Sequence, residues 1–352
     1  MKKTDLYNEH EKLGAKFMEF NGWKMPIKYT SIIDEHNAVR TNIGIFDIGH
    51  MGVFTVVGND AEKFLNSVTL GNVSGLINKK ARYSMILNDN AGIKDDIIIY
   101  KIDKEYMIVV NAVNFEKDYI WLNKHKTNNV EINDISSEIY ILAIQGCGAL
   151  DLLQSISLTD IYIMKKFTIS NLQLNGINAD FCRIARTGYT GEDGFEIFIS
   201  KKQIIKLWEK FMTLHVKPCG LGCRDTLRRS MPLYGHEIDE SINPIEVGFE
   251  KIINWDNNFI GKNKLLSIIK TKPLRKLVNF ECISGSIARS LDEVYVNNNK
   301  IGYVTSGSFS PTLKKSIGRA LISTFADENK LEVNIHNKMK KIKVVSGPFY
   351  KR

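Results

Sequence analysis

Two adjacent carboxylates, Asp95 and Asp96, are the side chains in this sequence best placed to do chemistry. They follow a turn-forming stretch, residues 88–92, and open an unbroken apolar run at residues 97–100. A strand that is apolar on both faces is normally buried on both faces. Because side chains alternate along a strand, Asp96 shares its face with Ile98, and Asp95 lies on the other face. We therefore expect Asp96 to point into the interior and Asp95 to point to solvent.

An inward carboxylate is costly to bury alone, so we expect Asp96 to have a partner or a role in a site. The alternative is that both acids sit at a hydrated strand end and help to terminate the turn. The residue types alone leave both interpretations open.

Another acid, Glu196, follows the glycine-rich loop at residues 186–194. Residues 195–199 alternate as in a strand, so Glu196 shares its face with Phe198, and that face is not simply solvent-exposed. Further side chains that suit a binding site are Arg224, Asn111, Tyr83, Tyr189 and Trp255. A carboxylate accepts two parallel hydrogen bonds from an edge that carries amino and ring N–H groups. The set therefore suits a neutral heterocycle, held for electrostatic activation and positioning rather than for covalent catalysis.

Several other kinds of site are disfavoured by the sequence. The five cysteines are scattered and odd in number, which argues against a disulfide framework. Cys219 and Cys223 lack the further ligands of a zinc site, so no metal is expected. The glycines near them complete no GxGxxG pattern, and no Walker A lysine follows. Nucleotide binding by those routes is therefore not expected.

The composition indicates a globular protein, and we do not expect it to span or bind a membrane. With 352 residues, 43% of them hydrophobic, the chain is long enough for two or three cores. No apolar run reaches the length of a membrane span, and the first ten residues resemble neither a signal nor a transit peptide, so we expect a cytoplasmic protein.

The net charge of +9 is uneven, because residues 257–280 hold six lysines or arginines and no acid. Aromatic residues are not interleaved with them, so we expect a solvated surface that steers an acidic protein or a polyanionic small molecule, and no nucleic acid.

The hydrophobic pattern indicates which elements position the candidate residues. Helices are expected at residues 6–17, 31–42 with Ser31 as the cap, 60–67, 115–126, 149–156 and 202–214. Strands are expected at residues 46–57, 83–87, 97–102, 106–111, 139–145, 181–186 and 195–199. From residue 277 onwards, short strands separated by turn residues suit a small β-barrel or sandwich.

Seven motifs follow one another along the chain in a recognisable order. They are Phe20-Asn-Gly-Trp-Lys-Met-Pro26, Phe46-Asp-Ile-Gly-His-Met51, Asp95-Asp96, Arg186-Thr-Gly-Tyr-Thr-Gly-Glu-Asp-Gly-Phe-Glu196, Gly220-Leu-Gly-Cys-Arg-Asp225, Leu233-Tyr-Gly235 and Thr305-Ser-Gly-Ser-Phe-Ser-Pro311. Together they resemble the aminomethyltransferase (T-protein) family of the glycine cleavage system, and the resemblance runs from residue 6 to residue 349.

This resemblance implies an α+β fold with three domains in a cloverleaf-like arrangement around a central folate channel. The implied domains are a discontinuous α/β folate-binding domain (residues 1–50 and 140–260), an α+β domain with the catalytic aspartate (51–139) and a C-terminal small β-barrel (275–352). The family takes the aminomethyl group from the lipoyl arm of H-protein, releases ammonia and forms 5,10-methylenetetrahydrofolate. Tetrahydrofolate is thus the implied co-substrate, lipoylated H-protein is the implied partner, and no metal is implied.

The same resemblance implies roles for individual residues. By motif match, Asp96 is the catalytic carboxylate, which holds the folate amine and favours the positive charge that develops there. Glu196 takes the amino edge of the pterin. The remaining folate-binding positions are Arg224, Tyr189, Asn111, Tyr83, Met51 and Tyr234. For Tyr83, Tyr189 and Met51 ordinary core packing remains an alternative, and for Arg224 a salt bridge to Asp225 does.

The chain departs from the family pattern after Arg228. The family usually continues Leu-Glu-x-Gly before its Leu-Tyr-Gly, whereas this chain has the shorter Arg229-Ser-Met-Pro-Leu-Tyr-Gly235 without that glutamate. A helix that loses two residues turns everything after it by roughly half a turn. We therefore expect an early helix end or a remodelled segment, a changed setting for Tyr234 and Arg224, and lower folate affinity in a chain that still folds.

Two alternative functions stay open. One is a folate-dependent demethylase of a small methylated amine or sulfonium compound. The other is a non-enzymatic folate-binding protein of iron–sulfur cluster maintenance, although the Lys-Gly-Cys motif of such relatives is absent from this sequence.

Overall fold

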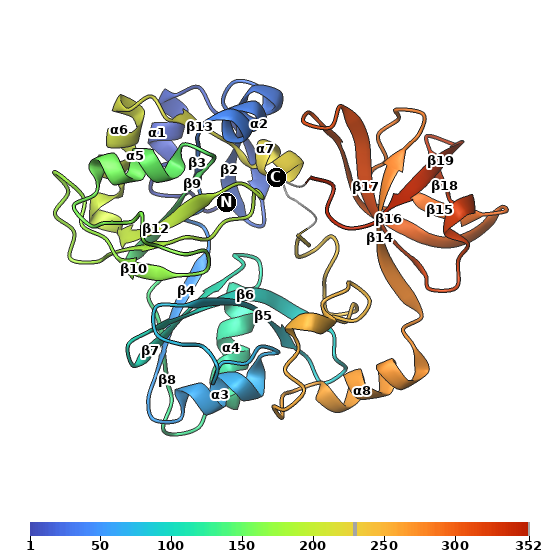
Figure 1. The fold of residues 1–352 in the computed structure, drawn as a ribbon, viewed down its shortest axis with the longest axis horizontal. Helices are drawn as coiled ribbons and strands as arrows, with labels where there is room; N and C mark the ends of the chain where they lie inside the picture. The colour runs from blue at the N-terminus through green and yellow to red at the C-terminus, as the bar shows by residue number, and fades with distance from the viewer. Residues whose placement is uncertain (228–230, 351–352) are drawn as a thin grey trace.

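The computed structural model of the chain describes residues 1–227 and 231–350. Three lobes surround a central region (Figure 1). We call them the first lobe, built on a six-stranded sheet, the second lobe, built on a five-stranded sheet, and the barrel. The α+β fold class with a closed C-terminal β-barrel is thereby confirmed.

The chain begins with helix α1 (Tyr7–Lys12), the hairpin β1 (Lys16–Phe20) and β2 (Trp23–Lys28), and helix α2 (Ile32–Thr41). The hairpin turns through Asn21 and Gly22, both at positive φ, as a tight hairpin turn requires. The first helix is shorter than the sequence pattern predicted. It stops at Lys12 because Gly14, at φ +73°, reverses the chain into β1. The Ser31 cap of α2 is confirmed, because its Oγ accepts a hydrogen bond from the Asp34 N–H at 3.0 Å.

The first lobe has a mixed sheet that helices cover. Its strands, in spatial order, are β10 (Ile169–Asn171), β11 (Cys182–Ala185), β12 (Gly194–Ser200), β9 (Ile139–Gln145), β3 (Gly44–Asp47) and β13 (Lys217–Pro218). Its helices are α1, α2, α5 (Ala149–Ile156), η1 (Lys201–Gln203), α6 (Ile204–Thr213) and α7 (Leu221–Leu227). Trp208 and Phe211 of α6 are buried against Phe195 of β12, so the amphipathic helix covers the apolar face of the sheet.

The second lobe is an antiparallel sheet, in the order β5 (Ala81–Leu87), β6 (Ile93–Ile102), β7 (Glu105–Val110), β4 (Gly52–Val57) and β8 (Glu131–Asp134). Helices α3 (Ala61–Val68) and α4 (Phe115–His125) cover the face that carries Ile97 and Ile99. The opposite face carries Tyr100 and packs against Ile141 and Phe198 of the first lobe. Strand β6 is therefore buried on both faces, as its unbroken apolar run predicted.

The single strand predicted for residues 46–57 is wrong. The chain leaves the first sheet after Asp47, turns through residues 48–51 and enters the second sheet as β4. Gly49 lies in this turn so close to the Tyr140 ring that an added Cβ would stand 2.2 Å from it. Only glycine fits there, so the break depends on a ring that is distant in sequence.

Residues 234–268 pack on the second lobe rather than on the first. Ile238, Ile245 and Phe259 are buried against Met85 and Leu87 of β5. This segment contains η2 (Glu250–Ile252) and leads into α8 (Lys262–Thr271). We therefore propose domains that follow the three lobes. Residues 234–260, which the sequence analysis placed in the folate-binding domain, then belong to the second domain, together with residues 261–268.

The barrel closes through β14 (Arg275–Cys282), β17 (Lys315–Ser323), β16 (Asn299–Ser310), β15 (Glu293–Val296), β18 (Glu332–Ile335) and β19 (Lys338–Val345), and η3 (Glu328–Lys330) precedes β18. Phe280, Val304 and Ala320 fill its interior without exposure. Closure leaves no free sheet edge among these strands.

A buried carboxylate ties the N-terminal segment to the first sheet. Asp47 accepts hydrogen bonds from the Thr4 hydroxyl at 2.7 Å, the Tyr140 hydroxyl at 2.7 Å and the Gly49 N–H at 2.8 Å, and His10 Nε2 lies 2.8 Å from Oδ2. Burial alone raises the pKa of Asp47, but the hydrogen bond and charge of His10 and the other donors outweigh it and lower the pKa.

Asp47→Ala is expected to lower the free energy of unfolding by about 3–5 kcal/mol, because His10 and Tyr140 stay buried without their partner. The stabilisation is present above the ordinary aspartate pKa of ~3.9 and is lost as pH falls through the lower folded pKa. Urea unfolding measures the loss. Asp89→Ala at an exposed turn is the control and should change stability by less than ~0.5 kcal/mol; equal values for both variants would contradict this role for Asp47.

Candidate active site

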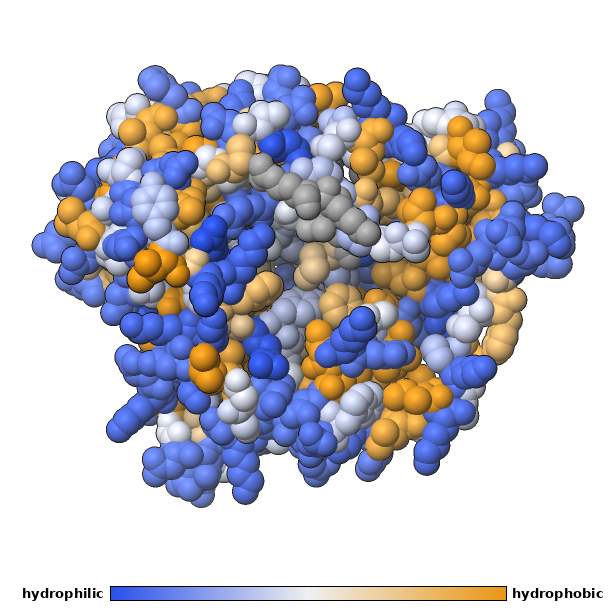
Figure 2. Space-filling view, viewed as in Figure 1, coloured by the Kyte–Doolittle hydropathy of each residue, from blue (hydrophilic) through white to orange (hydrophobic). Residues whose placement is uncertain are grey.

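A cavity of about 230 Å³ lies where the two sheets, α7 and residues 231–234 meet. The surface is hollowed at the junction of the three lobes (Figure 2). All eight site residues predicted from the sequence line this cavity: Met51, Tyr83, Asp96, Asn111, Tyr189, Glu196, Arg224 and Tyr234. Trp255 does not line the cavity. It lies in the segment that packs on the second lobe, where its ring centroid is 6.3 Å from that of Phe259.

Asp96 projects from β6 into the cavity. Its Oδ1 accepts a hydrogen bond from Asn111 Nδ2 at 2.8 Å, and its Oδ2 accepts one from the Tyr83 hydroxyl at 3.2 Å. Burial, and next the negative charge of Asp95, raise the pKa of Asp96 to about 7, while the two hydrogen bonds oppose the rise. The carboxyl group is thus poised to change its charge near neutral pH.

The expectation that Asp95 points to solvent is wrong. Its side chain has no exposure, because helix α4 covers the face of β6 opposite the cavity. It accepts hydrogen bonds from the Asn111 backbone N–H at 2.9 Å, from Asn111 Nδ2 at 2.8 Å and from Asn114 Nδ2 at 2.5 Å. The Asn111 amide therefore bonds both neighbouring carboxylates and fixes their relative position.

Glu196 projects from β12 of the facing sheet. Its Oε2 accepts hydrogen bonds from the Thr187 hydroxyl at 2.5 Å and from the Tyr100 hydroxyl at 3.2 Å. Burial raises the pKa of Glu196, and these two donors oppose the rise. The sequence reasoning assigned no site role to Thr187 or Tyr100. Both could have been found, because Thr187 stands in the same motif as Glu196 and Tyr100 shares a strand face with Asp96.

Arg224 and two tyrosines form another wall of the cavity. Arg224 extends from α7, bonds Asp225 Oδ1 at 3.0 Å and lies over the Phe20 ring at 5.2 Å, so it makes the expected salt bridge and also reaches the cavity. The Tyr189 hydroxyl donates to the Pro232 carbonyl at 2.5 Å. The Tyr234 hydroxyl accepts from Lys117 Nζ at 2.8 Å. All three side chains thus have polar partners as well as a place in the cavity wall.

The shortened stretch of the sequence lies at this wall. Arg228, Arg229 and Ser230 fall outside the described residues. On either side of them, α7 ends at Leu227 and residues 231–234 line the cavity. The early helix end or remodelled segment falls on residues outside the described ranges, so it stays a prediction, as does the lower folate affinity.

His50 is a cavity residue that the sequence reasoning did not select, although it stands in the motif that supplied Met51. It is buried between the rings of Phe20 and Trp23, 5.7 and 6.4 Å away. Burial lowers its pKa to about 4, so the imidazole is neutral at physiological pH.

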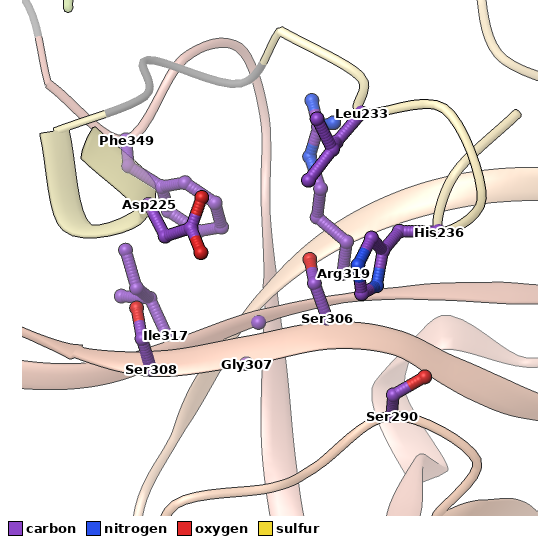
Figure 3. Close-up of a pocket in the computed structure, with 11 residues that line it drawn as sticks. Asp225, Leu233, His236, Ser290, Ser306, Gly307, Ser308, Ile317, Arg319 and Phe349 are labelled. Carbon is purple, nitrogen blue, oxygen red and sulfur yellow. The ribbon is translucent and has the colours of Figure 1, made fainter. Parts of the chain in front are cut away.

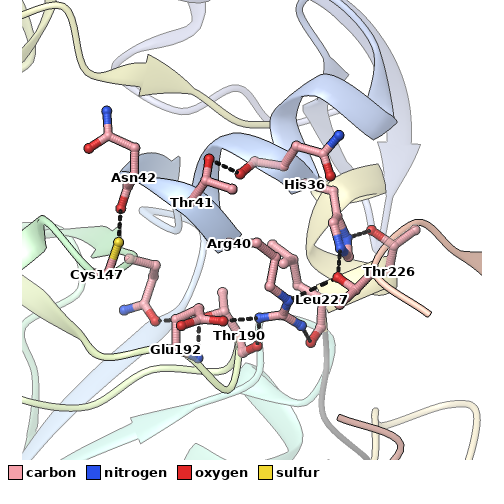
Figure 4. A network of polar contacts seen from close by, with 12 residues as sticks. His36, Arg40, Thr41, Asn42, Cys147, Thr190, Glu192, Thr226 and Leu227 are labelled. Atoms are coloured by element: carbon pink, nitrogen blue, oxygen red, sulfur yellow. Dashed lines mark hydrogen bonds and ion pairs between the residues drawn. The ribbon is translucent and has the colours of Figure 1, made fainter. Parts of the chain in front are cut away.

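A polar network holds α7 in place. Arg40 of α2 pairs with Glu192 at 2.9 Å and donates to the backbone carbonyls of Thr190 and Leu227, both at 2.9 Å (Figure 4). Nearby, His36 bonds the Thr226 hydroxyl at 2.8 Å and the Thr312 hydroxyl of the barrel at 2.6 Å. Arg224 is therefore presented by a helix that is anchored to both the first lobe and the barrel.

A smaller hollow of about 170 Å³ lies beside the cavity and shares Leu233 with it. Figure 3 shows Arg319 and Ser306 of the barrel beside Leu233 and His236, and Ile317 of the barrel near Asp225 and Phe349. The barrel thus contributes side chains next to the cavity without lining the cavity itself.

The class of protein follows from this fold and from comparison with known families. A family model described as the GCVT N-terminal domain matches residues 6–257, and one described as the glycine cleavage T-protein C-terminal barrel domain matches residues 275–351. The chain belongs to the glycine cleavage T-protein family.

Within this family the chain is similar to enzymes named aminomethyltransferase. Those of Thermoanaerobacter pseudethanolicus and Geobacillus sp. are 45% and 44% identical to it over 100% of this chain, and over 98% and 99% of their own length. The crystal structure of glycine cleavage system aminomethyltransferase T from Bartonella henselae is 29% identical and superposes with a TM-score of 0.92, over 98% of this chain and 97% of that one.

In the part of the chain that the structure describes, no helix is long and apolar enough to cross a membrane. The same residues contain no group of three or more His, Cys, Asp or Glu side chains placed to hold a metal ion.

The pKa of Asp96 leads to a pH prediction. If the ionised carboxylate is the active form, the rate of the chemical step should fall about tenfold per pH unit below pH 7 and level off above it. Tyr83→Phe removes a hydrogen bond that lowers this pKa, so the acid limb should move to higher pH. Single-turnover rates between pH 5.5 and 8.5, ~0.5 unit apart, measure both profiles. A rate that does not change with pH would contradict the prediction.

Proposed function

We propose that this chain takes the aminomethyl group carried on the lipoyl arm of H-protein, releases ammonia and passes the methylene unit to tetrahydrofolate. The products are 5,10-methylenetetrahydrofolate and dihydrolipoyl H-protein. The observation that carries the proposal is the presence of two carboxylates from facing sheets, Asp96 and Glu196, in one cavity. We place this activity in the cytoplasm, as the sequence predicted.

The chemistry of the cavity fits a reduced pterin. Glu196 has a carboxylate that accepts from amino and ring N–H groups, and its raised pKa is restored towards normal by such donors. Apolar and aromatic groups such as Met51, Tyr83 and Ile98 suit a flat ring. Arg224 supplies a cation for the acidic end of a folate. These features support tetrahydrofolate as the substrate that receives the one-carbon unit.

Asp96 is the proposed catalytic carboxylate. In its ionised form it favours the positive charge that develops when the amine reacts, because the charge is preorganised in a site of low dielectric. Asn111 and Tyr83 hold it by hydrogen bonds to separate oxygens, so the carboxylate does not have to reorient during the reaction. Transfer is thus promoted by charge and position, without a covalent enzyme intermediate.

Asp96→Asn is expected to lower the rate by about a hundredfold or more, since the shape is kept and the charge is lost. The assay follows ammonia release and methylenetetrahydrofolate formation from aminomethylated H-protein. Tetrahydrofolate should still raise the melting temperature of the variant, which shows that the site is intact. Asp89→Asn, at the exposed turn before β6, is the control and should react like the wild type. Wild-type rates for Asp96→Asn would refute the proposed role.

The basic segment from Lys262 to Lys276 is the proposed docking surface for acidic H-protein. This segment contains α8, which lies at the outer edge between the second lobe and the barrel (Figure 1). Lys264, Lys270 and Lys272 are exposed. Complementary charge on the partner would speed association at low ionic strength.

Glutamate in place of Lys264, Lys270 and Lys272 is expected to raise the KM for H-protein and to flatten its dependence on salt, because the net positive charge of the segment is cancelled. The turnover at saturating H-protein should stay unchanged. Steady-state kinetics at low and high ionic strength measure the effect. An affinity of the wild type that is the same at both salt concentrations would rule out electrostatic docking.

A further inference from the structure

A third carboxylate, Asp118 of α4, lies behind the two acids of β6, on the side away from the cavity. Asp95 and Asp118 are both completely buried. Asn114, whose side-chain amide bonds Asp95, lies one helical turn before Asp118, and its carbonyl accepts a hydrogen bond from the Asp118 N–H at 2.8 Å. The Asp118 side chain therefore lies on the same buried side of β6 as Asp95, and each group shifts the pKa of the other. Asp118 belongs to the helix that covers this face of the second lobe, and it is separated from the cavity by β6.

The hydrogen bonds around the two groups are unequal. Asp95 accepts from three N–H groups, two of Asn111 and one of Asn114. In the ranges 1–227 and 231–350, by contrast, no group donates a hydrogen bond to either carboxyl oxygen of Asp118. An ionised carboxylate only accepts, so two ionised groups here would repel each other without compensation in a water-free interface. The pair must therefore share one proton.

The proton belongs on Asp118. A proton on Asp95 would compete with the N–H groups that already donate to its oxygens. A proton on Asp118 meets no such competition, because no described group donates to the Asp118 oxygens, and it lets Asp118 donate a hydrogen bond to Asp95. Burial raises the pKa of Asp118 most, the charge of Asp95 adds to the rise, and the pKa reaches about 10.

The neighbouring cations do not replace that proton. Lys94 of β6 lies 3.5 Å from Glu240 and over the Trp121 ring at 4.6 Å. Lys117 of α4 pairs with Glu240 at 3.0 Å and donates to the Lys94 carbonyl at 2.8 Å. Both lysines lower the pKa of Asp118, but they are the smallest contributions to its shift. Their ammonium groups are held by other partners.

We propose that Asp118 is a positioning residue for the reaction: it keeps one proton at neutral pH, donates it in a hydrogen bond to Asp95, and thereby holds Asn111 and, through Asn111, Asp96. The chain of contacts is continuous, because Asn111 Nδ2 bonds Asp95 Oδ1 and Asp96 Oδ1, both at 2.8 Å. The bond also keeps Asp95 ionised, and its charge is the second cause of the raised pKa of Asp96. The effect on turnover rests on the proposed function, whereas the shared proton does not.

The shared proton is tested by counting protons on unfolding. In the unfolded chain an aspartate has a pKa of ~3.9, so the proton is released when the wild type unfolds at pH 7. Asp118→Asn has nearly the same shape and an amide N–H for Asp95, but it carries no ionisable proton. Its unfolding should release one proton fewer, measured by calorimetry in buffers of different ionisation enthalpy. Equal proton release by the two proteins would overturn the proposal.

Positioning is tested by two substitutions of unlike chemistry. Asp118→Asn keeps a donor and should keep kcat within about twofold of the wild type. Asp118→Leu fills the space without a donor and should lower kcat roughly tenfold or more while the KM for tetrahydrofolate changes little, because Asp96 is misplaced rather than lost. Glu116→Leu, at an exposed position of the same helix, is the control for general effects on α4.

A wild-type kcat for Asp118→Leu, or an equal loss for Asn and Leu, would overturn the positioning role. If the wild type itself transfers no aminomethyl group, the proposed function fails. The proton count then still decides whether Asp95 and Asp118 share a proton. The two failures are thus distinguishable.

Discussion

The structure depends on the burial of one strand, β6, on both of its faces. An apolar strand of this kind is stable only between two layers, and here these are helices α3 and α4 on one side and the sheet of the first lobe on the other. The same arrangement places Asp95 and Asp96 at low dielectric with opposite directions. Two adjacent carboxylates can be buried there because Asn111 bonds both and because their environments differ. The raised pKa of Asp96 is a consequence of that burial.

The cavity is a product of the contact between lobes. Its two carboxylates come from different sheets, and Tyr100 of β6 reaches across to Glu196 of β12, so the contact that joins the sheets also orients Glu196, the acid proposed to bind the pterin. Gly49 lets the chain pass from one sheet to the other next to the Tyr140 ring. The Arg40–Glu192 pair and the His36 contacts then fix α7 and its Arg224 against the barrel. Rigid elements thus support each cavity wall, which suits catalysis by position and charge.

Much of the fold could be predicted from local pattern. The Ser31 cap, helices near residues 60–67 and 115–126, the apolar run of β6 and the closely spaced strands of the barrel follow from capping, periodicity and turn residues, which are properties of neighbours in sequence. Two predicted elements were wrong for different reasons. Helix α1 stops early because Gly14, close by in sequence, reverses the chain, whereas the predicted strand at 46–57 breaks at Gly49 because of a ring distant in sequence. The packing of residues 234–268 on the second lobe also depends on partners distant in sequence.

For the site, the sequence by itself determined which residue types are present, which strand face carries Asp96, and that the ordered motifs resemble one family. Only the tertiary structure brought the eight predicted residues to one cavity, and only it showed Asp95 buried, Thr187 and Tyr100 bonded to Glu196, and Asp118 buried without a hydrogen-bond donor among the described residues. The physical reason is that alternation along a strand predicts on which face of the strand a side chain lies, but not which other element packs on that face. The charge and pKa of a carboxyl group depend on that cover, which here comes from α4 and from the facing sheet.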